Sequence, residues 1–374
     1  MSHKFLVLGV PPGGLFMARQ LRKTWPDSTI HAIGDPQHDI GRYSNTLDRF
    51  YEATSSGEVI QAIKQAYDAL GEGSVKAFMC SNPILECLVG QHPEVFDLLE
   101  FENPKEVYQQ LVDKKAVDGL CKHLAVLRPE EYSLTDACYS GFSFPVVVKP
   151  LEKGLAVGAS KCAYLGDEHQ LITYLAKIDA LGIDRNNLIC QQCVEGDNRW
   201  EYGYGGYFRH GKPLVDICFY QFKQVPQGLC CYSREMTNMD LQRQIKELVT
   251  PLLMEIDYNG FMEFDVKQDA NTNALYLLDV NPRPWRSVDM LTVKLGDSTI
   301  FAPSLNDNKV EWHYCYRELF AKKNNKNVST KVCRQLTMGN GFVRHETLFD
   351  KNDREPLKQQ RRLDFNDFLK KLKR

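Results

Sequence analysis

The stretch YLLDVNPRPW, residues 276–285, ends an apolar run with a carboxylate, an amide, two prolines and an arginine. If the run forms a strand, successive side chains point to opposite faces, so Asp279, Asn281 and Arg283 share one face. The leucines and the valine of the same stretch would help to anchor the strand. The sequence therefore predicts a strand edge that presents an acid, an amide and a cation in a row.

A second strand with polar residues precedes this one. In GFMEFDV, Glu263 and Asp265 alternate with a phenylalanine and also share a face. If the two strands pair as a hairpin across the polar turn KQDANTNA, one face carries three carboxylates, an amide and a guanidinium. Such crowding costs free energy unless a cation or a charged ligand neutralises it, and oxygen ligands of this kind suit Mg²⁺. The alternative is a solvated outer face on which Arg283 pairs with an acid.

Other segments are compatible with a nucleotide. Lys149 ends the run FPVVVKP, where three valines indicate burial and the ammonium needs an anionic partner. The next loop contains Gly154 and Gly158, which could bring backbone amides over phosphate oxygens. Further on, LICQQCVEGDNRW breaks from an apolar strand into a polar turn. Its backbone could line an adenine while Glu195 or Asn198 reaches a ribose hydroxyl, although an ordinary strand-to-turn transition is the alternative.

The composition is that of a soluble globular protein, with 43% hydrophobic and 25% charged residues among 374. The formal net charge of −2 gives no long-range attraction towards nucleic acid or an anionic membrane. The N-terminal apolar run of about six residues is too short for a signal peptide or a membrane span, so we expect a cytoplasmic protein. The twelve cysteines do not form two CxxC pairs, which favours reduced, buried thiols over zinc ligands.

The order of elements predicts α/β plus α+β architecture. FLVLGV, TIHAIGD and VKAFMC read as strands of a small parallel domain, with one helix capped by Ser56 and ended by Gly71. Its GVPPGGL turn lacks GxGxxG spacing and has two prolines without amide donors, so a simple strand-to-helix turn is expected there. Residues 107–127 have helical spacing. The region from 142 to 292 is strand-rich with a helix near 241–256, and the chain after 300 reads as polar and helical.

In this order, the features resemble the ATP-grasp superfamily. The resemblance consists of a DK pair (Asp113, Lys114) at a helix start, a strand ending in lysine, a glycine-containing flap, a hinge strand ending in EGD, and LLDVNPR, its most specific motif. It covers about residues 1–300. Within the superfamily, the chain looks most similar to carboxylate–amine ligases related to carbamoyl-phosphate synthase halves, D-alanine ligases and D-aspartate ligase-like proteins.

The resemblance implies a Rossmann-like pre-ATP-grasp domain over 1–105, a two-lobed ATP-grasp domain over 106–300 and a C-terminal helical segment over 301–374. The first lobe would cover about 106–190 and the second about 191–300. The resemblance also implies roles for single residues. Lys114, Lys149 and Lys223 would contact the ATP phosphates under a flap that contains Gly154 and Gly158, and the adenine would lie along Gln191, Gln192 and Val194, with Glu195 or Asn198 near the ribose. The metal ion would be held by Asp265 (or Glu263), Asp279 and Asn281, and a substrate carboxylate would be bound by Arg283.

Two residues depart from the family pattern. The family usually has glutamate where this chain has Asp279, and the shorter side chain must draw the ion closer or bind one ion where two are usual. The hinge usually opens with glutamate, and here it has Gln191, whose oxygen can still accept a hydrogen bond from the adenine amino group. Both departures bear on catalytic rate more than on ATP binding.

The predicted function is an ATP-dependent ligase that joins a carboxylate to an amine through an acyl phosphate, with Mg²⁺ or, alternatively, Mn²⁺. The partners would be small-molecule substrates, with an amino acid on one side, and neither nucleic acid nor a membrane span; a homodimer is left open. One alternative is an ATP-binding regulatory protein that has kept the fold and lost turnover. Another is carboxylation with bicarbonate, which would need a partner biotin domain or glutaminase.

Overall fold

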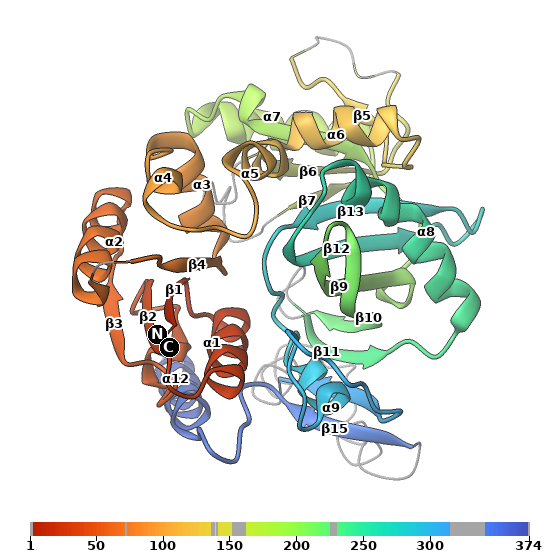
Figure 1. The fold of residues 1–374 in the computed structure, drawn as a ribbon. Coiled ribbons are helices and arrows are strands. Elements are labelled where there is room, and N and C mark those ends of the chain that lie inside the picture. The colour runs from red at the N-terminus through yellow and green to blue at the C-terminus, as the bar shows by residue number, and fades with distance from the viewer. Residues whose placement is uncertain are drawn as a thin grey trace.

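The computed structural model describes residues 3–71, 73–135, 139, 141–151, 162–224, 230–314 and 341–372. Gly154 and Gly158 of the predicted flap lie outside these ranges, and the side chain of Asn198 is not described. Within them the chain forms one parallel sheet and two mainly antiparallel sheets, each accompanied by helices (Figure 1). This mixture agrees with the predicted α/β and α+β class, whereas the domain boundaries near residues 105, 190 and 300 stay predictions.

The N-terminal domain is built on a parallel sheet with the strand order β3-β2-β1-β4. The apolar strand β1 is buried because α1 covers one face of the sheet while α2 and α3 cover the other. Its elements are β1 (Lys4–Leu8), α1 (Pro12–Thr24), β2 (Thr29–Gly34), η1 (Ile40–Tyr43), β3 (Arg49–Glu52), α2 (Ser56–Leu70), β4 (Lys76–Met79), α3 (Asn82–Gln91) and α4 (Val95–Leu98).

Local signals define both ends of α2. The N-cap is Ser55, whose hydroxyl oxygen accepts a hydrogen bond from the backbone amide of Glu58 at 3.4 Å. The sequence analysis placed the cap at Ser56, one residue too late. The helix ends at Gly71, as predicted, with φ +74, a conformation that glycine adopts without the steric cost of a Cβ atom.

The single helical region predicted at 107–127 is two helices, α5 (Lys105–Val112) and α6 (Lys114–His123). Asp113 separates them with an extended backbone, and its carboxylate accepts hydrogen bonds from the amides of Lys115 and Ala116. It is thus the N-cap of α6. The apolar spacing continues across this cap, which is why periodicity alone predicted one helix.

A small sheet with the order β5-β8-β6-β7 follows, backed by α7. Val146 and Val148 of β6 are fully buried against α7, while Val147 points to the other face and is only partly buried. The elements are β5 (Glu131–Tyr132), β6 (Val146–Pro150), β7 (Ala163–Leu165), α7 (Glu168–Ala180), η2 (Arg185–Asn187) and β8 (Leu188–Gln192).

The third sheet has seven strands in the order β13-β12-β9-β10-β11-β14-β15. Helix α8 covers one face, where Ile245 and Val249 pack with Phe264 and Leu277. The other face packs against α1 of the N-terminal domain through a core that includes Trp285. The elements are η3 (Asn198–Trp200), β9 (Glu201–Arg209), β10 (Lys212–Gln224), β11 (Cys230–Glu235), α8 (Met239–Glu255), β12 (Gly260–Gln268), β13 (Leu275–Asn281), α9 (Met290–Leu295), β14 (Lys309–His313) and β15 (Phe342–Glu346).

The C-terminal segment differs from the prediction. Its described part includes the helix α12 (Glu355–Leu372), but β14 and β15 extend the large sheet, so the segment that the sequence analysis described as helical also contains two strands. The chain then returns to the N-terminal domain (Figure 1). There Asp353, 4% exposed, accepts hydrogen bonds from Arg19 Nε at 2.9 Å and Ser44 Oγ at 2.6 Å. This buried ion pair ties the two ends of the chain together.

Two further features concern the whole described chain. Its cysteines are free thiols, most of them buried, as the sequence predicted. Among the helices that the structure describes, none has the length and apolar character needed to cross a bilayer.

Candidate functional site

The predicted hairpin is present. Strands β12 and β13 pair in antiparallel register, with Asp265 opposite Asp279 and Glu263 opposite Asn281. The polar turn sets this register because the Asp269 carboxylate accepts hydrogen bonds from the backbone amides of residues 271 and 272. The four polar side chains lie on the face opposite α8, as the alternation predicted.

Two acids face each other across the hairpin. Burial raises the pKa of Asp265 to about 6, and the negative charge of Asp279 acts in the same direction. Gln221 of β10 donates its Nε2 to Asp265 Oδ1 at 2.7 Å, which favours the carboxylate. The sequence analysis missed Gln221, although a polar residue inside the apolar run ICFYQFK was a visible signal. A pair of facing, partly buried carboxylates is an arrangement that a bound cation would stabilise.

Two lysines approach the hairpin from the small sheet. Lys149 ends β6, and its Nζ lies 3.5 Å from the carbonyl oxygen of Leu278 in β13. Burial lowers the pKa of the Lys149 ammonium, while the charge of Asp279 opposes that shift. Lys114, at the start of α6, donates its Nζ to the carbonyl oxygen of Pro150 at 2.8 Å. Both cations therefore gather at the end of β6, beside the acidic strand.

The predicted hinge joins the two sheets. Gln191 is 3% exposed, and its Nε2 donates to Glu131 Oε1 of β5 at 2.8 Å. The side chain thus has a protein partner that the sequence analysis did not identify, 60 positions earlier in the chain. The backbone amide of Gln192 donates to the carbonyl oxygen of Glu130 at 2.8 Å. These bonds fix β8 at the edge of the predicted adenine position.

The segment after β8 contacts the hairpin turn. Val194 is buried at 7% exposure. The backbone amide of Glu195 donates to Asp269 Oδ2 at 3.3 Å, and its carbonyl accepts from the amide of Ala270 at 3.1 Å. The Glu195 side chain is exposed. The hinge and the acidic hairpin therefore form one connected unit.

Arg283 lies at the end of the polar row. Its Nη1 is 3.7 Å from Glu263 Oε2, and its Nη2 donates to Asn281 Oδ1 at 3.4 Å. The two acids of β12 have different partners, because Glu263 faces Arg283 while Asp265 faces Asp279. Asp265 is thus better placed than Glu263 to share an ion with Asp279, although the metal assignment stays a prediction.

The N-terminal domain also reaches this region. Asn82, the first residue of α3, donates its Nδ2 to Asn281 Oδ1 at 3.3 Å. A Cβ at Gly13 of α1 would lie 2.6 Å from the Pro284 carbonyl oxygen, so α1 packs directly on the turn after β13. Nothing in the local sequence indicated these contacts, since Asn82 and Asn281 are 199 positions apart and Gly13 and Pro284 are separated even further.

No family model matches the chain. D-alanine–D-alanine ligase B of Xanthomonas campestris is 26% identical over 162 residues, which cover 40% of this chain and 46% of that protein. The chain therefore aligns with less than half the length of this curated relative.

Solved structures extend the likeness to most of the chain. The N5-carboxyaminoimidazole synthetase of Staphylococcus aureus superposes with a TM-score of 0.62 at 14% identity, covering 87% of both chains. The L-amino acid ligase of Bacillus licheniformis gives a TM-score of 0.60 at 13% identity, covering 80% of this chain and 72% of that one. The chain has the ATP-grasp fold. The resemblance noted from the sequence is thus confirmed for the fold, whereas the roles of single residues stay predictions.

The acidic hairpin offers oxygen donors that could hold a metal ion. No cluster of three or more His, Cys, Asp and Glu side chains that could hold a metal ion occurs among the residues that the structure describes. The predicted set is instead two facing carboxylates, Asp265 and Asp279, with the amide of Asn281 on the same strand. Such hard oxygen donors fit Mg²⁺, which commonly takes one or two carboxylates and completes its shell with water and phosphate oxygens.

Lys223 lies apart from this group, whereas the GVPPGGL turn packs beside it through Gly13. Lys223 of β10 has its Nζ 6.0 Å from the ring centre of Tyr232, and the described contacts do not bring it to the acidic hairpin. The GVPPGGL turn serves packing: a Cβ at Gly14 would lie 2.1 Å from the carbonyl oxygen of Gly9. The expected absence of a dinucleotide fingerprint there is consistent with this close approach.

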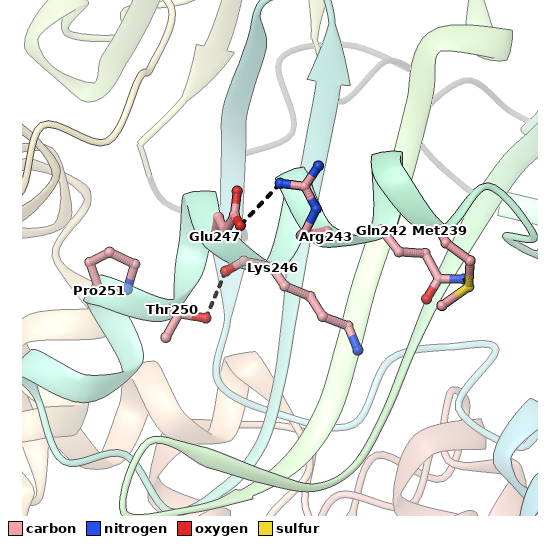
Figure 2. A pocket seen from close by; sticks show the side chains of 7 residues that line it. All are labelled: Met239, Gln242, Arg243, Lys246, Glu247, Thr250 and Pro251. Atoms are coloured by element: carbon pink, nitrogen blue, oxygen red, sulfur yellow. Dashed lines mark hydrogen bonds and ion pairs between the residues drawn. The ribbon is translucent and has the colours of Figure 1, made fainter.

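A shallow hollow lies on the outer face of α8 (Figure 2). The acidic side chains of the hairpin lie on the opposite face of the sheet that α8 covers. Seven residues of that one helix line it: Met239, Gln242, Arg243, Lys246, Glu247, Thr250 and Pro251. Arg243 pairs with Glu247 at 3.3 Å, and Lys246 pairs with Asp216 at 2.6 Å. Its charged side chains are thus engaged locally, and none of the predicted site residues borders it.

Proposed function

We propose that this chain is an ATP-dependent ligase that joins a carboxylate to an amine through an acyl phosphate. The observation that carries the proposal is the meeting of Lys149 with the Asp265–Asp279 pair, since it brings a cation and two acids together from two different sheets. Phosphate oxygens and an accompanying metal ion are the ligands that such a mixed group would neutralise.

Related structures support a nucleotide in this fold. A second structure of the Staphylococcus aureus synthetase is complexed with ADP, at a TM-score of 0.59 and 13% identity. A biotin carboxylase domain from Hydrogenobacter thermophilus, with the same TM-score and identity, was solved in complex with MgADP and bicarbonate. We therefore propose ATP and Mg²⁺ as the ligands of this chain, with Asp265, Asp279 and Asn281 holding the ion.

The proposed chemistry needs no protein nucleophile. A carboxylate oxygen of the substrate attacks the γ-phosphorus and ADP leaves; the amine nitrogen then attacks the acyl carbon, phosphate leaves and the amine loses a proton. Lys114 and Lys149 would bind and orient phosphate oxygens, and Arg283 would orient the substrate carboxylate. When bound, Mg²⁺ supplies Lewis-acid stabilisation of the phosphate charge.

An amino acid is the proposed substrate on one side of the reaction. Two relatives carry names that point to it, a D-alanine–D-alanine ligase and an L-amino acid ligase. A free α-carboxylate would suit Arg283, whose guanidinium is only partly offset by Glu263 at 3.7 Å.

The test is ADP release. The chain is incubated with ATP, Mg²⁺ and a panel of single and paired amino acids, with and without bicarbonate. We expect equimolar ADP and phosphate with at least one amino-acid pair in the absence of bicarbonate. Release that depends on bicarbonate would favour carboxylation instead.

The second candidate is an ATP-binding regulatory protein. Two observations favour it: aspartate at 279 where the family usually has glutamate, and the engagement of Gln191 with Glu131 in the hinge. Such a protein would bind a non-hydrolysable ATP analogue yet release no ADP above background with any substrate. Failure to bind the analogue would contradict both candidates.

A further inference from the structure

The NPRP turn, residues 281–284, is held between two rigid elements. Its Pro284 carbonyl lies directly on Gly13 of α1, where a Cβ would be only 2.6 Å away. Just beyond the turn, Trp285 is 1% exposed and lies against Gly205 of β9, where a Cβ would be 2.6 Å from the indole ring. The turn has little room to shift, so a side chain that reaches it from the N-terminal domain meets a fixed target.

Asn82 reaches this turn from the start of α3. Its side chain is 92% buried (8% exposed), and its Nδ2 donates to Asn281 Oδ1 at 3.3 Å. Arg283 Nη2 donates to the same oxygen at 3.4 Å, which fixes the amide of Asn281 with its oxygen towards the donors. The backbone before Asn82 is also fixed, because Gly9, at φ +88, lets the end of β1 approach Ser81 so closely that a Cβ would be 2.3 Å from the Ser81 Cβ.

Packing alone does not account for an asparagine at this position. The Oδ1 atom of Asn82 is buried and has no hydrogen-bond partner among the described residues. A buried acceptor without a partner costs stability, and leucine has nearly the same shape without that cost. What asparagine supplies is the hydrogen bond from Nδ2 to Asn281, one of the residues proposed to hold the metal ion.

We infer that Asn82 is a positioning residue that holds the amide oxygen of Asn281 for the metal ion. An amide oxygen has two lone pairs, so an ion and one donor can share it. In this arrangement the Arg283 guanidinium turns from Asn281 to the substrate carboxylate, which is its proposed role. The N-terminal domain thus becomes part of the metal end of the site without touching the ion. The inference rests on the proposed function, because it requires a metal ion bound with the nucleotide.

Binding of a non-hydrolysable ATP analogue, measured by calorimetry over a series of Mg²⁺ concentrations, tests the inference. Loss of a side chain that orients a metal ligand typically lowers metal affinity 10–100-fold. We therefore expect the half-saturating Mg²⁺ concentration to rise at least about tenfold in Asn82→Leu and Asn82→Ala. The unfolding temperature of Asn82→Leu should stay the same or rise, since the unsatisfied acceptor is removed.

Asn103 provides a matched control. It is 3% exposed and also joins the N-terminal region to the large sheet, donating to the Asn259 carbonyl at 2.6 Å and accepting from the Asn259 amide at 2.7 Å. Asn103→Ala should lower the unfolding temperature and leave the Mg²⁺ dependence unchanged. Replacing a residue with a merely structural role would change the unfolding temperature but not the half-saturating Mg²⁺ concentration.

Two outcomes overturn the inference and leave the proposed function standing. In the first, the half-saturating Mg²⁺ concentrations of both Asn82 variants lie within twofold of that of the unmodified chain. In the second, Asn103→Ala raises this concentration equally, which would mean that loosening any contact between the domains has the same effect. If the unmodified chain binds the analogue without any dependence on Mg²⁺, or does not bind it, the proposed function fails and the inference with it. Mg²⁺-dependent binding of the analogue by the unmodified chain therefore distinguishes the two failures.

Discussion

Replacing Asp279 with asparagine tests the centre of the proposed site. The substitution keeps the shape of the side chain and removes one negative charge. That charge faces Asp265 across the hairpin and is the strongest charge acting on the Lys149 ammonium. We expect ATP-dependent ADP release to be abolished while the fold is retained, because backbone hydrogen bonds to β12 and apolar packing with α8 still hold β13.

The size of the effect follows from the charge that is lost. Two unit charges 4 Å apart interact by about 4 kcal/mol at an effective dielectric constant of about 20. A divalent ion that loses one carboxylate ligand loses at least a comparable interaction free energy, and the amide oxygen of the asparagine introduced at position 279 restores part of it. We therefore expect Mg²⁺ affinity to fall by at least about 100-fold, which corresponds to about 2.7 kcal/mol. Stability should change little, because the loss of a partner for Lys149 is offset by the loss of repulsion with Asp265.

The assay measures ADP release at saturating ATP over a Mg²⁺ series. Asp279→Glu is the conservative control: it keeps the charge and restores the residue usual in the family, so it should retain turnover. Asp240→Asn, on the outer face of α8 with a side chain 85% exposed, controls for a general change of charge and should behave like the unmodified chain. Turnover of Asp279→Asn within about threefold of the unmodified chain would refute the metal assignment.

Three further predictions concern single groups. Lys149→Ala should weaken binding of an ATP analogue at least about tenfold in calorimetry, because the buried ammonium is lost; unchanged affinity would count against its phosphate role. Binding of Mg²⁺ with the analogue should fall as the pH is lowered through about 6, because Asp265 takes up a proton there, and a flat profile from pH 7.5 to 5 would contradict that shift. Asp353→Ala should destabilise the chain by about 3–5 kcal/mol in denaturant unfolding, because it leaves the guanidinium of Arg19 buried without its acid; an unchanged midpoint would mean that the pair contributes nothing.

The acidic hairpin was predictable because its information is local. The alternation of Glu263 with Asp265, and of Asp279 with Asn281, lies within 20 residues, and the polar turn between them fixes the register. The end of α2 at Gly71 was local in the same sense. Each of these features follows from side-chain period and turn chemistry, which a single segment carries in full.

The partners of the hairpin were not predictable, because they come from distant segments. Gln221 lies two strands away from Asp265 in the sheet, and Glu131 reaches Gln191 from 60 positions earlier. Strand β15 was missed for a related reason: it pairs in parallel with β14, which lies about 30 residues earlier in the chain. Non-local pairing leaves no periodic signal in the segment that takes part in it.

The balance of charge around the hairpin links the site to its proposed ligand. Three acids and three bases converge there: Glu263, Asp265, Asp279, Lys114, Lys149 and Arg283. Their formal charges cancel, but Asp265 and Asp279 face one another across the hairpin, and burial lowers the pKa of Lys149. A dication between the two acids would relieve their repulsion and leave the group with a net charge of +2. A triphosphate would neutralise that positive charge. The proposed function therefore predicts that the ion and the nucleotide bind together, each more weakly without the other.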